Sequence, residues 1–368
     1  MLVEYYINHN IYKSGEGLTL SEITLKLPIH IEKIILNNKG NKYDFEKNKI
    51  SNYLIEILID YSFISEIENH YNLIPNSNYS FYSLDSKCFL EEFKKIKYEV
   101  GIFEVPYFHG AIKHDYSVQS VYVLKENSYK TPNPNDSFIF EQNHSYKQRK
   151  VLDYGFLRIN QKKIMEKEIY SLSHKIFSTC EKCLLPVFIG GDHSITYSIL
   201  CGLRDSNPNE KIRLVNLDAH SDLGYFDKEI FNGNVINAIS TIDNVEVINF
   251  GLRGPITYNE AKNIKSKLKV FTDIDKMLNY LYLDKTVKTY VSIDLDVFDP
   301  SIISAVTFPV SGGIDIEDYE RLLEGLKELN IIGVDVVEYN ATFDYNSQNA
   351  SSINLIIYKI IKMLQSIR

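Results

Sequence analysis

The sequence has few cysteines, no excess of basic side chains and no long apolar run. Its four cysteines, Cys88, Cys180, Cys183 and Cys201, are too few for a disulfide framework in 368 residues. Forty basic side chains against 48 acidic ones give a net charge of −8, which disfavours a general binder of nucleic-acid phosphates. No apolar run approaches the roughly 20 residues of a membrane span, and the first 30 residues lack a secretory signal. We therefore expect a cytoplasmic protein that partners neither nucleic acid nor a membrane.

The first part of the chain, residues 1–95, is rich in Ile, Leu, Tyr, Asn and Lys. Its pattern predicts a strand over residues 2–12, a helix that starts at Pro28 and stops before Gly40, and a second helix from Ser51. We expect a small α+β, winged-helix-like module. It resembles the small domains that bind precursor leaders in ribosomal peptide maturation, and this resemblance implies peptide recognition. A helical cap or an oligomerisation arm fits the same pattern.

The remainder, residues 98–368, alternates short apolar runs with helical patterns. Seven runs are expected as buried parallel strands: VGIFEVP, LPVFIGG, RLVNLDAH, VEVINFG, LKVFTD, TYVSIDLD and IIGVDVVE. Two helix faces are expected as well, one of Met165, Ile169, Leu172, Ile176 and Cys180, the other of Ile353, Ile356, Ile357, Ile360, Ile361 and Leu364. This alternation predicts an α/β domain with three layers, αβα, and a mostly parallel sheet.

Two segments of this domain depart from the alternation. Residues 125–150 are rich in Pro, Asn and charge, so we expect a long surface loop there that could act as a lid. Cys180 and Cys183 have the CxxC spacing of zinc or redox sites. No second pair accompanies them, and Cys180 continues a buried helix face, which favours a structural role.

Three of the expected strands end in histidine and aspartate. The segments are Gly190–Ser194 (GGDHS), Asp218–Asp222 (DAHSD) and Ser292–Asp296 (SIDLD). Because ligands collect at the carboxyl ends of the strands in open α/β sheets, these segments can converge. Four carboxylates in one crevice repel one another unless cations compensate them, which two divalent ions would do. Oxygen ligands with two imidazoles favour Mn²⁺ over Zn²⁺ and Mg²⁺. The candidate ligands are His193, Asp218, His220, Asp222, Asp294 and Asp296.

The segments GGDHS, DAHSD and SIDLDVFDP resemble the three signatures of the ureohydrolases, which include arginase, agmatinase and formiminoglutamase. A fourth segment, GVDVVE at residues 333–338, resembles the last strand of that family. The resemblance covers residues 98–368 and implies an arginase-like fold with two Mn²⁺ as cofactors. It assigns one ion to His193, Asp218, Asp222 and Asp294, and the other to Asp218, His220, Asp294 and Asp296.

The resemblance also implies roles in catalysis. Water activated between the two cations would attack a guanidinium carbon. Glu338 would pair with the guanidinium, and Asp222 would pass a proton to the departing amine, giving an amine and urea. Asn234 matches an asparagine that binds the head group of the substrate in this family.

The chain departs from the family pattern at the proton relay. Arginases and agmatinases carry a His-Gly pair about a dozen residues after the DAHxD motif, whereas here that position falls on Ile236 or Asn237. General acid-base assistance is typically worth about 10²–10⁴-fold. We therefore expect a slow enzyme or another proton carrier, for which His109, His114 and His144 are candidates.

A second departure bears on the substrate. Free-arginine arginases follow the GLR motif with acidic residues that bind the α-amino group, but here Gly251–Arg253 is followed by GPIT. Such a site suits agmatine or an arginine inside a peptide. The N-terminal module favours the peptide, because a second binding site raises effective concentration. The sequence thus most resembles peptide arginases, which convert arginine to ornithine in ribosomally made precursor peptides.

The expected partner is an arginine-containing precursor peptide, and we expect a homo-oligomer. Two other interpretations stay open. One is an agmatinase or an arginase of free arginine. The other is a catalytically inactive metal-binding scaffold, which the missing histidine supports and the six intact ligands oppose.

Overall fold

The structure is a computed structural model that describes most of the chain beyond residue 98 and short segments before it. The described residues are 5–7, 12–14, 17–20, 23–25, 29–37, 42–43, 64–65, 73–74, 80–85, 99–112, 119–137, 149–157, 162–180, 183–225 and 229–367. Two compact units divide the chain. One comprises residues 1–73 and 157–168, and the other comprises residues 74–156 and 169–368.

The described part of the first unit contains two small antiparallel sheets and a helix. One sheet joins β1 (Tyr5–Ile7) to β5 (Lys42–Tyr43) and β6 (Ile64–Ser65), and the other orders β2 (Tyr12–Ser14), β3 (Gly17–Leu20) and β4 (Ile23–Leu25). Helix α1 (Ile29–Asn37) buries Ile31 and Ile35, four residues apart on one face. It confirms the helix predicted to start at Pro28. Of the predicted strand over residues 2–12, the structure describes 5–7 as β1. The second helix, predicted from Ser51, lies outside the described residues.

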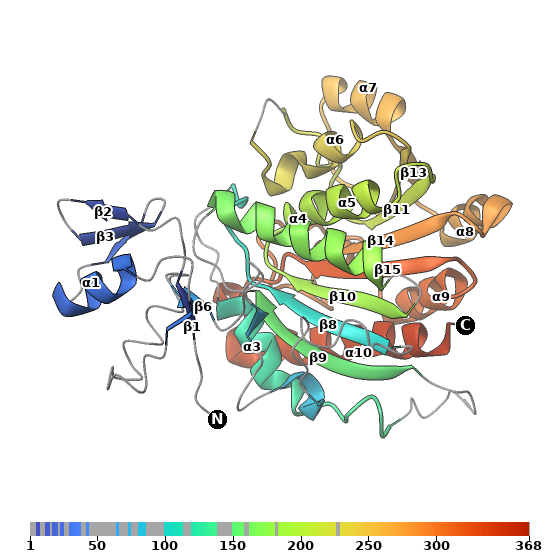
Figure 1. Ribbon diagram of the computed structural model, residues 1–368. Helices are drawn as coiled ribbons and strands as arrows, with labels where there is room; N and C mark the ends of the chain where they lie inside the picture. Colours follow the sequence, from blue (N-terminus) through green and yellow to red (C-terminus); the bar gives the residue numbers. More distant parts are fainter. Residues whose placement is uncertain are drawn as a thin grey trace. The chain divides into compact units, whose positions relative to one another are not determined.

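The second unit is built on a sheet whose strands run in the order β13-β12-β11-β14-β15-β10-β8-β9-β7 (Figure 1). Every described pairing from β13 to β9 is parallel. The bounds are β7 Leu73–Ile74, β8 Glu99–Val105, β9 Lys150–Leu157, β10 Leu184–Gly190, β11 Ile212–Leu217, β12 Val245–Phe250, β13 Lys269–Phe271, β14 Lys288–Asp294 and β15 Ile331–Val337. The seven predicted strands are confirmed as parallel strands, but β13, at the edge of the sheet, is exposed or half-buried where a buried strand was predicted. Strand β9 was not predicted, because Asp153 and Gly155 interrupt its apolar run.

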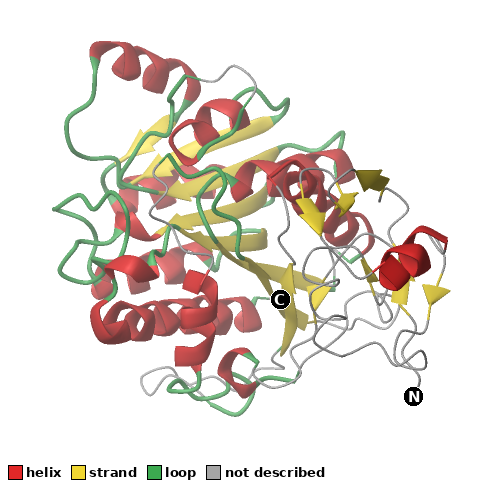
Figure 2. Ribbon diagram, turned by 90° about the vertical axis from the view of Figure 1, so that its left-hand side faces the viewer, coloured by secondary structure: helices red, strands yellow, loops and turns green. Residues whose placement is uncertain are grey.

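Helices cover both faces of this sheet, which confirms the three-layer α/β architecture (Figure 2). Their bounds are α3 Gln119–Ser128, α4 Lys162–Thr179, α5 Ile195–Ser206, α6 Val235–Ile239, α7 Tyr258–Lys267, α8 Ile274–Leu281, α9 Ile316–Leu326 and α10 Gln348–Ser366. Helix α10 packs against α3 and α9, and α9 packs against α8, whereas α5 packs against α6. The described helices include none with the length and apolar character needed to cross a membrane.

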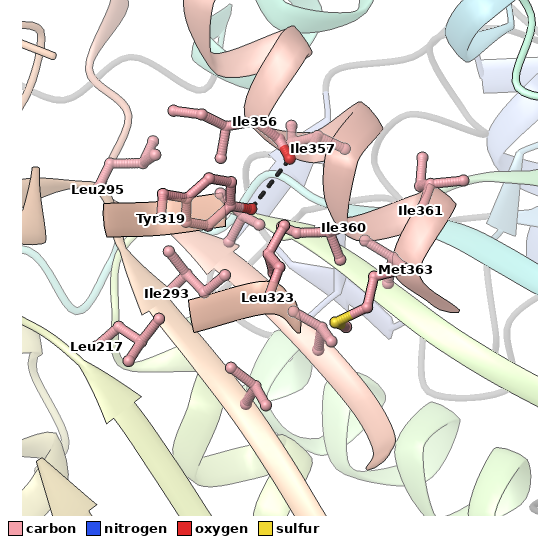
Figure 3. Packing of buried hydrophobic residues seen from close by; sticks show 14 of the residues in the cluster. Leu217, Ile293, Leu295, Tyr319, Leu323, Ile356, Ile357, Ile360, Ile361 and Met363 are labelled. Carbon is pink, nitrogen blue, oxygen red and sulfur yellow. Dashed lines mark hydrogen bonds between the residues drawn. The ribbon is translucent and has the colours of Figure 1, made fainter. Parts of the chain in front are cut away.

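The main apolar core lies between the sheet and the layer of α9 and α10 (Figure 3). Leu217 and Ile293 from the strands meet Tyr319 of α9 and Ile360 of α10, all essentially without exposure. The Tyr319 hydroxyl donates a hydrogen bond of 3.1 Å to the Ile356 carbonyl, so the polar end of this buried ring is satisfied (Figure 3). Of the first predicted helix face, Ile169, Leu172, Ile176 and Cys180 are buried, while the side chain of Met165 lies outside the described part. All six residues of the second predicted face are buried, and the burial of Cys180 agrees with its structural interpretation.

The prediction of a long surface loop over residues 125–150 is wrong at its two ends, which belong to α3 and β9, whereas residues 129–137 form turns without a helix or strand. Residues up to Ser128 belong to α3, and Lys125 is buried against Glu104, with 2.6 Å between Lys125 Nζ and Glu104 Oε1. The turn that follows is packed, because Lys362 Nζ donates to the Pro134 carbonyl at 3.1 Å. The charged side chain of Lys125 predicts a solvent-exposed segment, but its buried ion pair with Glu104 allows it to lie in the interior at the end of this helix. Residues 138–148 lie outside the described part.

Candidate metal centre

The sheet order brings the three ligand-bearing segments together at one edge. Strands β11, β14, β15 and β10 are neighbours, and each ends at the same carboxyl edge. In the register of β11 and β14, Leu217 pairs with Ile293, so the residues that follow them, Asp218 and Asp294, lie side by side. Segments far apart in the sequence thus converge as predicted from their place at strand ends.

His193 forms the buried centre of the first group. Its Nδ1 lies 3.0 Å from Asp222 Oδ2, 3.3 Å from Asp294 Oδ2 and 3.5 Å from Asp218 Oδ2. The side chain is fully buried, and Nδ1 makes no hydrogen bond of good geometry with any described residue. Burial opposes charging of the ring, but the adjacent carboxylates of Asp222 and Asp294 outweigh it and raise the pKa of His193 well above its usual range.

The second group comprises Asp218, His220 and Asp296. His220 Nδ1 lies 2.7 Å from Asp296 Oδ2 and 3.8 Å from Asp218 Oδ1, so Asp218 belongs to both groups. Burial, and after it repulsion from neighbouring aspartates, raises the pKa values of Asp218 and Asp294 well above their usual range. Divalent cations would replace the protons that this crowding favours. Two imidazoles and four carboxylates fit such ions, since the described side-chain atoms close to Nδ1 of His193 are carboxylate oxygens.

Backbone groups orient the carboxylates of this cluster. Asp218 Oδ1 accepts from the N–H of His220 at 2.6 Å, and Asp294 Oδ1 accepts from the N–H of Asp296 at 2.9 Å. Asp296 Oδ1 accepts from the N–H of Ala219 at 3.0 Å. In each of these aspartates Oδ2 then faces a histidine ring. The bond from Ala219 to Asp296 joins the loops after β11 and β14, and together these bonds orient the carboxylates of both loops.

Arg253 supports the loop after β14 through hydrogen bonds, a role that the sequence analysis did not predict. Among the described residues, its guanidinium donates to backbone carbonyls, including those of Asp296 and Val310 at 2.7 Å each. Further bonds of 3.1–3.3 Å reach the carbonyls of Gly251, Val297, Phe298 and Ser311. The sequence assigns no role to the GLR motif itself and shows only that GPIT, without acidic residues, follows it. In the structure the motif is a support for the ligand segment.

Glu338 follows β15 directly and reaches the same cluster. Its backbone has φ of 72°, in the left-handed region that costs a non-glycine residue about 1–2 kcal/mol. The N–H of Glu338 donates to the Gly191 carbonyl at 2.9 Å, and Oε1 accepts from the N–H of His193 at 2.8 Å. Only glycine fits at Gly191, because a Cβ there would lie 1.7 Å from the Tyr107 carbonyl oxygen. Backbone strain and close packing thus place this carboxylate beside His193.

The predicted head-group residue Asn234 is not brought to the cluster. Its Nδ2 donates to the carbonyls of Tyr225 and Glu229 at 3.0 Å each, and its Oδ1 accepts from the N–H of Phe231 at 2.9 Å. These bonds shape the loop before α6. Instead, Asn232 donates from Nδ2 to Glu338 Oε1 at 3.2 Å. Asn232 and Asn234 belong to the same Asn-Gly-Asn segment, and the sequence does not show which of them reaches Glu338. Only the fold distinguishes the two asparagines.

The position of the missing relay histidine is filled by core and loop contacts. Ile236 is fully buried in α6, and Asn237 Nδ2 donates to the Gly224 carbonyl at 2.8 Å. Of the alternative carriers, His109 is exposed on the loop after β8, with its ring 5.6 Å from that of Tyr107. His114 and His144 lie outside the described residues.

One further carboxylate near the cluster was not predicted. Glu260, on α7, accepts a hydrogen bond of 2.5 Å at Oε1 from the Ser221 hydroxyl. Ser221 stands between the candidate ligands His220 and Asp222 in sequence. Glu260 lies on α7, after the GPIT turn, and reaches the segment of His220 and Asp222 from there. The four residues directly after the GLR motif therefore did not indicate it.

Comparison with known proteins places this site in a family. The arginase family matches residues 100–362. A formimidoylglutamase of Hahella chejuensis is 26% identical over 202 residues, 49% of this chain and 62% of that protein. A mitochondrial arginase of Medicago truncatula is 31% identical over 178 residues, 45% of this chain and 51% of that protein. The alignments thus span less than two thirds of these two relatives.

Solved structures agree in fold. Proclavaminate amidino hydrolase from Streptomyces clavuligerus superposes with a TM-score of 0.66 at 18% identity, covering 82% of this chain and all (100%) of that one. Formimidoylglutamase from Bacillus subtilis gives a TM-score of 0.65 at 17% identity, covering 83% of this chain and 98% of that one. With the match over residues 100–362 and the His-Asp cluster at the carboxyl edge of the sheet, this chain belongs to the arginase family, whose members are hydrolases that act on amidino bonds.

Proposed function

We propose that this protein hydrolyses the guanidino group of arginine within a peptide and leaves ornithine and urea. The observation that carries the proposal is the convergence of six candidate ligands with Glu338, whose Oε1 lies 2.8 Å from the backbone nitrogen of His193. His193, Asp218, Asp222 and Asp294 would hold one Mn²⁺, and Asp218, His220, Asp294 and Asp296 the other. When bound, the two ions would supply an activated water molecule as the nucleophile.

The residues of the chain account for the other parts of the reaction. Glu338 pairs with the guanidinium and orients its carbon toward the cluster, since a charge-assisted bond is about twice as strong as a neutral one. Asp222, with 12% of its side chain exposed, takes a proton from the attacking water. It passes that proton to the departing nitrogen as the carbon–nitrogen bond breaks. An oxygen–carbon bond forms, and the products are the amine of ornithine and neutral urea.

The choice of a peptide depends on the surroundings of the centre. The two relatives are an arginase and a formimidoylglutamase, whose names point to different amidino substrates on one scaffold. In this chain the GPIT turn supplies no acidic group for an α-amino head. Residues 1–95 offer a second place to hold a precursor peptide, and such a site raises the effective concentration of the reacting arginine.

Glu260 favours a second candidate, a small guanidino amine such as agmatine. Its carboxylate, 2.5 Å from the Ser221 hydroxyl, would pair with a free ammonium group. A Glu260→Gln variant separates the two proposals. It should leave turnover of an arginine peptide unchanged if the substrate is a peptide, and should raise KM for agmatine if the substrate is a small amine.

Mass spectrometry with Mn²⁺ present tests the function directly. We expect an arginine-containing peptide to lose the mass of CH₂N₂ per arginine, and the Glu338→Gln protein to leave the peptide intact. Urea released only from agmatine or free arginine would replace the peptide proposal. Turnover of none of these substrates by metal-loaded protein would favour the inactive scaffold.

A further inference from the structure

A buried carboxylate behind the cluster, Asp335, is not among the candidate ligands. It lies on β15 and is fully buried. Three hydroxyls converge on it: Ser292 Oγ donates to Oδ1 at 2.5 Å, while Thr196 Oγ1 and Tyr290 OH donate to Oδ2 at 2.9 and 3.0 Å. No lysine or arginine of the described residues forms an ion pair with it. Burying a carboxylate costs more free energy than burying an apolar side chain. The role of Asp335 is therefore to be found in the hydroxyl groups that bind it.

The sheet register connects Asp335 to His193. Ser292 on β14 pairs with Asp335 on β15, and Ser292 shares its strand face with the candidate ligand Asp294. Ser292 Oγ lies 3.2 Å from His193 Nε2. A continuous path therefore runs from Asp335 through one hydroxyl to the ring nitrogen that points away from the cluster.

Counting protons along this path assigns the tautomer of His193. Ser292 has one hydroxyl proton, and its 2.5 Å contact with a carboxylate, which only accepts, directs that proton to Asp335. The lone pair of Ser292 Oγ then faces His193 Nε2, so Nε2 carries the ring hydrogen. When a cation takes the place of the second ring proton, the imidazole is neutral and Nδ1 is its acceptor nitrogen. It is this atom that lies within 3.5 Å of the carboxylates.

We propose that Asp335, acting through Ser292, fixes the tautomer and orientation of His193 so that Nδ1 is presented to a metal ion. Asp335 is then a positioning residue, and this role rests on the metal centre proposed above. An acceptor nitrogen among acceptor oxygens is repulsive by itself and favourable only around a cation. Partners of metal-binding histidines typically contribute about 10–100-fold to metal affinity.

Three variants of the full chain test the proposal. Asp335→Asn is close in shape, but its amide can donate to Ser292 and turn the serine proton toward Nε2. Ser292→Ala removes the hydroxyl that links Asp335 to His193. It replaces Asp335→Asn in the test if that variant does not fold. Tyr290→Phe is the matched control, because it removes a hydrogen bond to the opposite oxygen, Oδ2, and leaves the path to His193 intact.

The first measurement is Mn²⁺ affinity by competition with a chelator, which does not depend on turnover. We expect Asp335→Asn and Ser292→Ala to bind Mn²⁺ about 10–100-fold more weakly than the parent protein, and Tyr290→Phe to stay within about threefold. Equal weakening in all three would mean that Asp335 only supports packing, and unchanged affinity in the folded variants would overturn the proposal. A parent protein that binds no Mn²⁺ would overturn it together with the metal centre.

The second measurement is the tautomer itself. Long-range ¹H–¹⁵N spectra of histidine-labelled, Zn²⁺-loaded protein should show His193 protonated at Nε2 in the parent and in Tyr290→Phe. We expect that signature to be lost in Ser292→Ala or Asp335→Asn, and its persistence in both would contradict the proposal. If the Mn²⁺ and tautomer effects are present but no guanidino compound is hydrolysed, the positioning role stands and the proposed function fails.

Discussion

At the residue scale, Asp218 is the carboxylate that both groups of the cluster share. We predict that Asp218→Ala abolishes activity and removes both ions, because it deletes a ligand from each group at once. Asp294→Ala should act in the same way, because Asp294 is also proposed as a ligand of both ions. Metal analysis of the purified variants checks this, with Asp275→Ala as an exposed aspartate control. Two tightly held ions in the Asp218 variant would refute its bridging role.

Glu338 has a different expected effect, since it contacts the cluster through the backbone of His193. We predict that Glu338→Gln keeps its metal content and loses most of its turnover, at least about tenfold, because a neutral amide pairs more weakly with a guanidinium. The amide oxygen can still accept from the N–H of His193, so the fold should be retained. Steady-state kinetics with parallel metal analysis makes the comparison. Unchanged kinetics would place Glu338 outside the substrate site.

At the element scale, the edge of the sheet formed by β12 and β13 depends on charge. Glu246 on β12 lies 2.6 Å from Lys269 on β13 and 2.9 Å from Lys211, and Tyr280 of α8 donates to it at 2.5 Å. Burial opposes ionisation of Glu246, but the bonds from Lys269 and Tyr280 prevail and lower its pKa to about 2. A depressed carboxylate pKa stabilises the fold above the unfolded value, and this contribution is lost as the pH falls through the folded value.

We therefore predict that Glu246→Gln lowers the free energy of unfolding at pH 7 by at most about 1 kcal/mol, because the lysine partners are half exposed and solvent screens them. The difference from the parent protein should shrink between about pH 4.5 and pH 2. Urea unfolding across this range measures it. Glu328→Gln, at an exposed glutamate 3.4 Å from Lys285, is the matched control and should have little effect. A difference independent of pH would mean that the amide disturbs packing instead.

At the scale of the whole molecule, the unit boundary determines where a truncation can be made. The sequence suggested a module ending near residue 95, but Phe81 and Tyr82 are fully buried in the core of the second unit. The Tyr82 hydroxyl donates to the Asn354 carbonyl of α10 at 2.8 Å. A truncation at 95 would remove these contacts, whereas one at residue 72 spares them and agrees with the unit boundary at residue 73.

We predict that deleting residues 1–72 weakens processing of a full-length precursor peptide at least about tenfold more than hydrolysis of a short arginine peptide. A disordered precursor loses conformational entropy on binding, and a second binding site offsets that cost. Comparison of kcat/KM for the two substrates, at equal metal content, checks the prediction. Equal losses on both substrates would show that the segment completes the active site or an oligomer.

Some features of this protein are determined by local sequence alone. The strands β10, β11 and β14 follow from short, largely apolar runs, and the histidines and aspartates that end them form the candidate metal centre. Such features are predictable because buried parallel strands are typically rich in apolar residues, and the carboxyl ends of such strands meet at one edge of the sheet.

Other features were decided only by the tertiary structure, because they depend on partners distant in sequence. The sequence did not predict β9 or the end of α3, because the charged residues Asp153 and Lys125 are typical of exposed positions. In the structure both are buried, and Lys125 Nζ lies 3.5 Å from Asp153 Oδ2. Asn232 and Asn234 are equivalent in sequence, and only the loop before α6 directs one of them to Glu338. The role of Asp335 likewise comes from its register opposite Ser292. A polar side chain can be buried only where the fold supplies its partner, so the sequence shows the residue and the structure shows the partner.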